Sequence, residues 1–195
     1  MTKAEKTRQF LIEQTAPIFN TKGVAATAVS DIMQATHLAK GSLYAHFENK
    51  EELAYCAVDY NLSEFFEKAG VVTRSQEYAK DKFFALLDLL SDPVNHPVQG
   101  GCPMLNFGVE ADDTSPVIRE KVRSAMEALL MDIVRTLEKG ISDGEFVGGW
   151  DVNEFAVKAF AMLEGGILMS RVYGNSASMT ILNKILKREI EEKIL

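Results

Sequence analysis

The sequence has few cysteines and no long apolar segment. The 195 residues include only two cysteines, Cys56 and Cys102, whose separation matches neither a metal-binding nor a redox motif. No apolar run approaches the ~20 residues that a membrane-spanning helix requires. The first sixteen residues, MTKAEKTRQFLIEQTA, lack the apolar core of a signal peptide. We therefore expect a cytoplasmic protein with reduced thiols and no membrane segment.

Motifs of catalysis are missing as well. The three histidines are His37, His46 and His96, and no serine or cysteine stands in a nucleophile motif. The chain has no phosphate-binding loop, no dinucleotide fingerprint and no pair of metal ligands on one predicted helix face. We expect neither an enzyme nor a protein that carries a cofactor or a metal ion.

The alternation of apolar and polar residues that marks strands is also absent, and only five prolines occur. Apolar residues instead recur at spacings of three and four, which predicts helices. The expected helices are one that ends before residues 20–24, then about 28–35, 39–47, a longer one from 48 or 49, 75–91, 103–112, 116–139, 152–173 and 176–193. The sequence therefore predicts an all-α fold of about nine helices, with three short helices before a larger bundle.

Several residues predict where the first helices bend, end and begin. Pro17 lies inside the first apolar stripe and predicts a bend, because proline removes an intrahelical donor. Gly23 follows that stripe and is a natural helix terminator. Thr27 is a suitable N-terminal cap for the second helix, and Asp31 favours its first turns because a carboxylate suits the helix dipole.

Residues 28–47 predict a helix-turn-helix, which is two short helices joined by a tight turn. Ile32, Leu38 and Leu43 have the spacing of buried contacts where the two helices cross. The exposed face of the second helix would consist of Ala39, Lys40, Gly41, Ser42, Tyr44, Ala45 and His46. Short polar and basic side chains on such a face are typical of a helix that enters a DNA groove.

Residues 27–53, TAVSDIMQATHLAKGSLYAHFENKEEL, resemble the start of the TetR family of transcriptional regulators. The resemblance implies a DNA-binding domain over residues 1–50 and a helical ligand-binding and dimerisation domain over residues 51–195. It further implies a repressor that a small, mainly apolar effector releases from a pseudo-palindromic operator in double-stranded DNA. Two positions depart from the family pattern: His37 stands where the turn usually has glycine, and Ala39 where serine or threonine is common.

The resemblance assigns DNA-contacting roles that suit the chemistry of the residues. Thr27, Lys40, Tyr44, His46 and Lys50 are expected to bind phosphate oxygens, while Gly41 allows close approach and Ser42 and Ala45 face base edges. Residues 1–50 hold six basic and four acidic side chains, a net charge of +2, whereas the remaining 15 basic and 24 acidic side chains give −9. Two alternatives are that Tyr44 and His46 pack against the first helix, and that the head binds proteins.

The last two predicted helices suit a dimer interface. Residues 155–172 are apolar nearly all round, which is too much for a helix with one face in water. Gly165 and Gly166 would permit close helix approach, and Ile181 and Ile185 recur at helical spacing on the last helix. We expect a homodimer through these two helices, with a buried core helix of a monomer as the alternative.

The body also offers aromatic and methionine side chains for an effector pocket, because methionine fills irregular apolar space adaptably. The expected lining residues are Phe66, Phe84, Met104, Phe107, Met126, Phe160 and Met162. Each of them suits an ordinary core position equally well.

Cys102 supports an alternative mode of sensing. It precedes Pro103 at a predicted helix start, where unpaired amides and the helix dipole favour a thiolate. Under this alternative the protein is a regulator that responds to electrophiles or oxidants through Cys102. A small buried side chain at a crowded helix start is the other interpretation.

Overall fold

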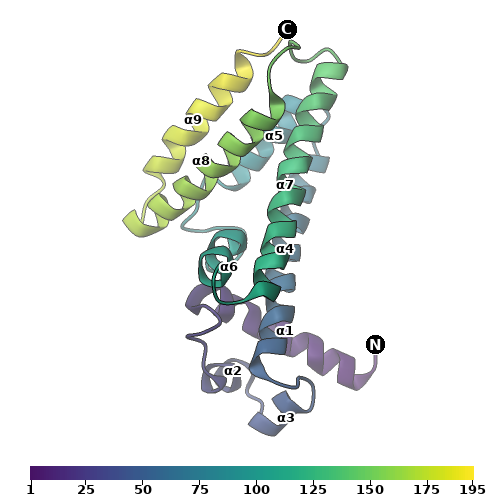
Figure 1. Cartoon of the computed structure of the whole chain (residues 1–195), viewed down its shortest axis with the longest axis vertical. Helices are drawn as coiled ribbons and strands as arrows, with labels where there is room; N and C mark the ends of the chain where they lie inside the picture. The colour runs from purple at the N-terminus through teal and green to yellow at the C-terminus, as the bar shows by residue number, and fades with distance from the viewer. The chain divides into compact units, whose positions relative to one another are not determined.

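The computed structural model describes all 195 residues and contains nine helices and no β-sheet, so the predicted all-α fold is confirmed (Figure 1). The helices are α1 (Lys3–Lys22), α2 (Val29–Thr36), α3 (Lys40–Tyr44), α4 (Lys50–Arg74), α5 (Ala79–Leu89), α6 (Pro103–Ala111), α7 (Pro116–Ser142), α8 (Val152–Tyr173) and α9 (Ala177–Glu191). None of these helices is both long enough and apolar enough to cross a membrane.

The chain forms two compact units, each of which is made of two separate stretches of the sequence. The first unit contains residues 1–65 and 98–124, and the second contains residues 66–97 and 125–195. Helices α4 and α7 each contribute residues to both units. The first unit therefore holds the helix-turn-helix together with α6, and the second holds α5, α8 and α9.

Helix α1 begins with a capping box, in which the Thr2 hydroxyl accepts from the Glu5 amide at 3.2 Å and the Glu5 carboxylate accepts from the Thr2 amide at 2.7 Å. The helix continues through Pro17 and ends at Gly23, whose φ of 85° is favourable only for glycine. Gly23 therefore ends the first helix as its sequence position predicted.

The predicted cap of α2 is wrong, because Ala28 rather than Thr27 occupies the N-cap position. Thr27 is fully buried, and its hydroxyl donates to the Gly23 carbonyl at 2.6 Å. The Asp31 carboxylate instead accepts from the Ala28 amide at 3.0 Å and from Lys22 Nζ at 2.8 Å. The hydrogen bond from Lys22, together with that from the Ala28 amide, lowers the pKa of Asp31.

His37 forms the turn between α2 and α3 in a left-handed conformation, with φ 55° and ψ 23°. Its amide donates to the Met33 carbonyl at 2.9 Å, which closes the C-terminus of α2. Ile32 and Leu43 are almost completely buried on either side of this turn, and Leu38 is half-buried. The predicted helix-turn-helix core is therefore present, although α3 is shorter than residues 39–47.

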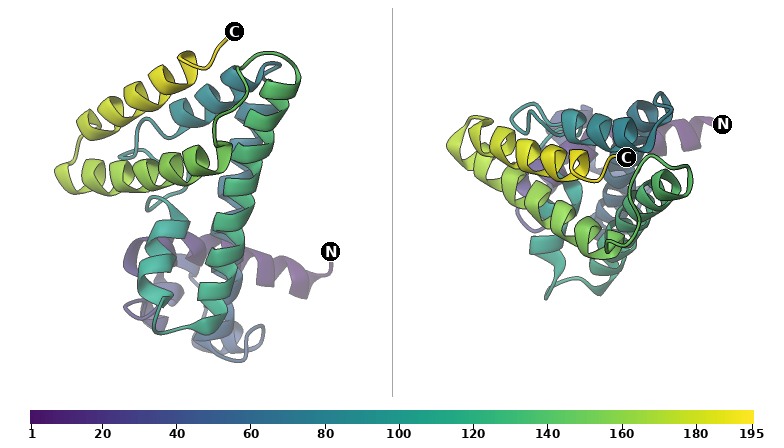
Figure 2. Two further views of the ribbon diagram at one scale, coloured as in Figure 1. Left: turned by 45° about the horizontal axis from the view of Figure 1, so that its top comes forward. Right: turned by 90° about the horizontal axis from the view of Figure 1, so that it is seen from above.

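The second unit is built on an α8–α9 hairpin, in which the two helices lie side by side (Figure 2). Gly166 makes their close packing possible, since a Cβ there would lie 2.8 Å from Leu182 Cδ1 and 3.0 Å from Met179 Cε. Asn183 of α9 donates to the Leu87 carbonyl of α5 at 3.1 Å, which ties α5 to the hairpin.

The strained turn at His37 yields a stability prediction. A left-handed conformation costs a non-glycine residue about 1–2 kcal/mol. Glycine avoids this strain, but its unfolded chain has greater entropy, which offsets part of the gain in stability. We expect His37→Gly to raise the free energy of unfolding by about 0.5–1 kcal/mol, measured by urea denaturation. His37→Ala, which keeps the Cβ, should give no such gain; equal stabilities of the glycine and alanine variants would contradict the explanation.

Candidate DNA-binding head and effector cavity

Four of the eight residues predicted to contact DNA lie on α3, and Ala45 and His46 follow it directly. Lys40, Gly41, Tyr44 and Ala45 are exposed, whereas Ser42 and His46 are half-buried. Lys40 Nζ lies 5.7 Å from the centroid of the Tyr44 ring, so the ammonium group and the phenol lie close together. Tyr44 retains 41% of its surface in solvent, which leaves its hydroxyl available to a partner.

Gly41 is not required by the packing of the head. A Cβ placed there would meet no atom within 4 Å, and its φ is not in the left-handed region. Because no contact within the chain needs glycine at this position, the absence of a side chain leaves room on the outer surface of α3. That room is what close approach of a DNA backbone would use.

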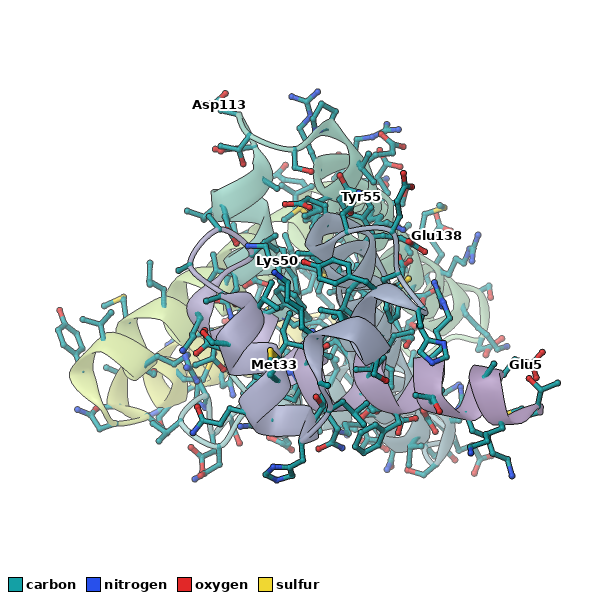
Figure 3. All side chains as sticks on the ribbon, turned by 90° about the horizontal axis from the view of Figure 1, so that it is seen from below. Glu5, Met33, Lys50, Tyr55, Asp113 and Glu138 are labelled. Carbon is teal, nitrogen blue, oxygen red and sulfur yellow. The ribbon has the colours of Figure 1, made fainter.

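Lys50 and Thr27 have partners inside the head. Lys50 Nζ donates to the Val24 carbonyl at 2.8 Å and to the Thr27 carbonyl at 2.9 Å, beside the loop that precedes α2 (Figure 3). The Thr27 hydroxyl is buried against Gly23. Both side chains therefore organise the α1–α2 loop, and we do not retain them among the proposed phosphate contacts.

Glu110 of α6 holds the amide side of the same loop. Its two carboxylate oxygens accept from the Val24 amide at 2.8 Å and from the Ala25 amide at 2.7 Å. A Cβ at Gly23 would lie 2.9 Å from a Glu110 oxygen, so the glycine also makes room for this contact. The α1–α2 loop is thus fixed by hydrogen bonds from its amides to the Glu110 carboxylate and from the Lys50 ammonium to its carbonyls.

Two asparagines extend this connection between α1 and α6. Asn106 Nδ2 lies 2.9 Å from the Asn20 carbonyl, 3.1 Å from Asn20 Oδ1 and 3.0 Å from the Gly100 carbonyl. Asn20 Nδ2 in turn donates to the carbonyls of Gln99 and Gly101 at 2.8 and 3.0 Å. Sequence reasoning missed these residues, because nothing in the sequence pairs an asparagine in α1 with one 86 positions later.

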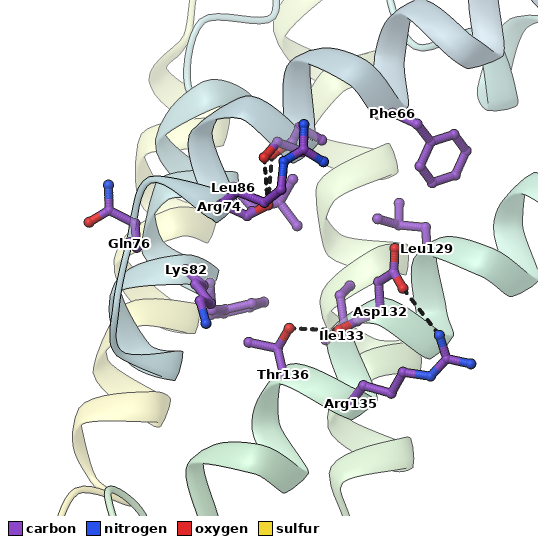
Figure 4. A pocket seen from close by; sticks show the side chains of 14 residues that line it. Phe66, Arg74, Gln76, Lys82, Leu86, Leu129, Asp132, Ile133, Arg135 and Thr136 are labelled. Carbon is purple, nitrogen blue, oxygen red and sulfur yellow. Dashed lines mark hydrogen bonds and ion pairs between the residues drawn. The ribbon is translucent and has the colours of Figure 1, made fainter.

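The second unit contains an open cavity of about 620 Å³ that is lined mainly by α4, α5 and α7 (Figure 4). Its apolar wall consists of Phe66, Ala69, Phe83, Leu86, Leu129 and Ile133. Its charged side chains are Arg74, Lys82, Asp132 and Arg135, and Gly70, Thr73, Gln76 and Thr136 complete the lining. Both the size and the mixed lining are those of a small-molecule site.

Of the residues predicted to line an effector pocket, Phe66 alone lines this cavity. Met104 and Phe107 are buried in the first unit. The others, which are Phe84, Met126, Phe160 and Met162, are half-buried outside the lining. On α5 the aromatic that faces the cavity is Phe83, whereas the neighbouring Phe84 ring lies 5.1 Å from Lys187 Nζ of α9.

Cys102 is the N-cap residue of α6 and is almost completely buried, and its side chain does not cap the helix. A reactive thiol needs access for its reagent, so this placement favours the interpretation as a small buried side chain. The other cysteine, Cys56, is half-buried and lies 3.2 Å from Arg8 Nη2. No group of three or more His, Cys, Asp or Glu side chains is arranged to hold a metal ion.

The helix-turn-helix head followed by a larger helical region is the architecture of a DNA-binding transcriptional regulator. Residues 11–54 match the family model for bacterial regulatory proteins of the tetR family, and residues 79–186 match the tetracyclin repressor-like C-terminal domain. The chain belongs to the TetR family of helix-turn-helix transcriptional regulators, which confirms the resemblance in its sequence.

Similar proteins cover nearly the whole chain. The transcriptional repressor DhaR of Mycobacterium sp. strain GP1 is 28% identical, with 86% of this chain and 84% of DhaR aligned. The regulator TtgR of Pseudomonas putida is 27% identical, with 84% of this chain and 79% of TtgR aligned. TetR-family regulators from Cytophaga hutchinsonii and Chloroflexus aurantiacus have solved structures with TM-scores of 0.91 and 0.94. Their identities are 36% and 35%, over 100% of this chain and 98% of each of theirs. All four of these relatives are transcriptional regulators by name.

The Glu110 contact leads to a testable prediction about the head. Glu110→Gln retains the size of the side chain but leaves only one acceptor oxygen, so either Val24 or Ala25 loses its partner. We expect a loss of about 1 kcal/mol of stability and faster hydrogen exchange of the two amides, measured by NMR. Asp113→Asn removes an exposed carboxylate just beyond α6 and is the matched control. Unchanged exchange at Val24 and Ala25 in Glu110→Gln would contradict the role of this carboxylate.

Proposed function

We propose that the protein is a cytoplasmic, homodimeric repressor that leaves a pseudo-palindromic operator when a small molecule occupies the cavity of the second unit. The observation that carries this proposal is that cavity, about 620 Å³ in volume, in a chain whose other unit is a DNA-binding head. Helices α4 and α7 contribute to both units, so a ligand that favours one arrangement of these helices also biases the head.

The proposed DNA contacts lie on and just after α3. Lys40, Tyr44 and His46 would bind phosphate oxygens, and Gly41 would let the backbone approach closely. Ser42 and Ala45 are small enough to face base edges in the major groove. Exposure of Lys40 and Tyr44, together with the empty space beside Gly41, supports this arrangement.

The proposed dimer interface uses a stripe of exposed apolar residues on α8 and α9. The stripe contains Val157, Ala161, Leu168, Val172, Ile181 and Ile185. Gly165 lies in the same stripe, and a Cβ there would meet nothing within 4 Å, so a second copy is able to approach it closely. Gly166 belongs to the packing of α8 on α9 within one chain, and the expectation that it lies at the dimer interface is abandoned.

Variants of two lysines in the head should distinguish an effect on DNA binding from an effect on stability. The Lys40 side chain has no hydrogen bond within the chain, so Lys40→Gln should leave the unfolding free energy unchanged and flatten the salt dependence of operator binding by about one unit of slope. Lys50→Gln should instead lower stability by about 1 kcal/mol, because it weakens the bonds to two carbonyls. Gel shifts with DNA upstream of the gene, at several salt concentrations, and urea denaturation measure both.

The opposite pattern, in which Lys50→Gln changes the salt slope and Lys40→Gln does not, would restore the phosphate role of Lys50. Failure of the wild-type protein to shift the upstream DNA, together with binding of another protein by the head, would favour the alternative of a protein-binding head.

The dimer prediction rests on Ile181, which is 60% exposed on α9. Ile181→Lys should give folded monomers and lose tight operator binding, since two linked heads supply the avidity that one head lacks. Val71→Lys, at an equally exposed position (59%) on α4, is the matched control and should remain dimeric. Sedimentation velocity at micromolar concentration measures the assembly; a monomeric wild-type protein or a dimeric Ile181→Lys would contradict the interface.

A further inference from the structure

We propose that the effector is an amphipathic carboxylate, whose apolar body fills the α4–α5–α7 cavity and whose charged end pairs with Arg74 and Lys82. This inference rests on the proposed function, because it specifies the chemistry of the ligand that the cavity would take. It also changes the mainly apolar effector that the sequence implied.

The apolar part of the cavity is provided by all three helices. Phe66 and Ala69 come from α4, Phe83 and Leu86 from α5, and Leu129 and Ile133 from α7. Burying a ligand chain or ring against this wall is favourable by roughly 25 cal/mol per Å² of apolar surface removed from water. The wall explains affinity for an apolar body but does not distinguish one apolar compound from another.

The charged side chains of the cavity supply the discrimination. Asp132 is the one acidic residue of the lining, and Arg135 Nη1 lies 3.7 Å from its carboxylate. Arg74 and Lys82 form no ion pair and no side-chain hydrogen bond within the chain, although the protein has a net charge of −7. The cavity thus presents two uncompensated cations, which favour a ligand with a negative end.

Other acidic side chains close to Lys82 are mostly engaged elsewhere. A smaller adjoining cavity shares Lys82 with the first and is also lined by Glu77, Asp143 and Glu145. Glu145 accepts from the amides of Ala79 and Lys80 at the start of α5, at 3.0 and 3.3 Å, and Asp143 pairs with Lys139 at 2.8 Å. Glu77 is exposed, so water screens its charge.

The position of Arg74 depends on a glycine in the cavity wall. A Cβ added at Gly70 would lie 2.5 Å from Arg74 Nη1 and 3.1 Å from Cζ, so the guanidinium occupies the place where a side chain would be. Gly70 and Arg74 both line the cavity. Arg74 is exposed, and its planar guanidinium is suited to bind a carboxylate with two parallel hydrogen bonds.

The test uses three carboxylates of different shape, namely decanoate, 2-naphthoate and 4-phenylbutyrate, each compared with its uncharged primary amide. Binding to the full chain is measured by titration calorimetry. We expect at least one acid to bind about tenfold more tightly than its amide, because a charge-assisted hydrogen bond is stronger than a neutral one. Arg74→Gln and Lys82→Gln should each remove most of that preference and leave amide binding unchanged.

Gly70→Ala is the sharpest variant because it displaces the guanidinium without removing any charge. Alanine favours the helix, so this variant should fold at least as stably as the wild type yet lose several-fold in affinity for the acid alone. Arg123→Gln removes one positive charge from α7 outside the cavity and should change neither affinity. An equal loss in Arg123→Gln would reduce the effect to long-range charge and overturn the site.

Operator release, measured by gel shift with the same compounds, separates this inference from the proposed function. Equal binding of acids and amides that both release the operator would overturn the carboxylate inference and leave the repressor function intact. Acid binding that depends on Arg74 and Lys82 but leaves operator affinity unchanged would support the carboxylate site and contradict ligand-driven release. Absence of binding by every acid at millimolar concentration would overturn the inference.

Discussion

The head depends on how the backbone between α1 and α2 is satisfied. A helix that ends in a short loop leaves amides and carbonyls that must find partners. Here the Glu110 carboxylate takes two amides, Lys50 takes two carbonyls and the Thr27 hydroxyl takes a third. The position of α2, and with it the turn at His37 and the outer face of α3, follows from this loop.

The same polar contacts explain why α6 belongs to the unit that contains the DNA-binding helices. Asn106 and Glu110 are four residues apart on α6 and bond to α1 and to the α1–α2 loop, respectively. Hydrogen bonds to buried backbone groups are directional and costly to break. A helix of the regulatory region is therefore fixed to the head by specific geometry, in addition to apolar packing.

The lining of the cavity and the exposed apolar stripe on α8 and α9 both depend on which face of each helix is turned inward. On α5 the choice falls between the adjacent Phe83 and Phe84, and on α8 between Gly165 and Gly166. In each pair one residue faces the interior of the unit and the other does not. Consecutive residues on a helix point about 100° apart. Phe83 therefore lines the cavity while Phe84 does not, and Gly166 packs against α9 while Gly165 has open space beside it.

The sequence by itself determined the nine helices, the glycine at the end of α1, the strained histidine turn and the family, because these follow from local periodicity and short-range backbone preferences. It also identified Lys40, Gly41, Tyr44 and Ala45 as exposed, whereas Ser42 and His46 are half-buried. Tertiary structure decided the partners of Lys50, Thr27, Asn106 and Glu110, and it decided which aromatic residues line the cavity. Those outcomes depend on contacts between residues far apart in the chain, and the rotation of each helix about its axis is set only when all its neighbours pack against it.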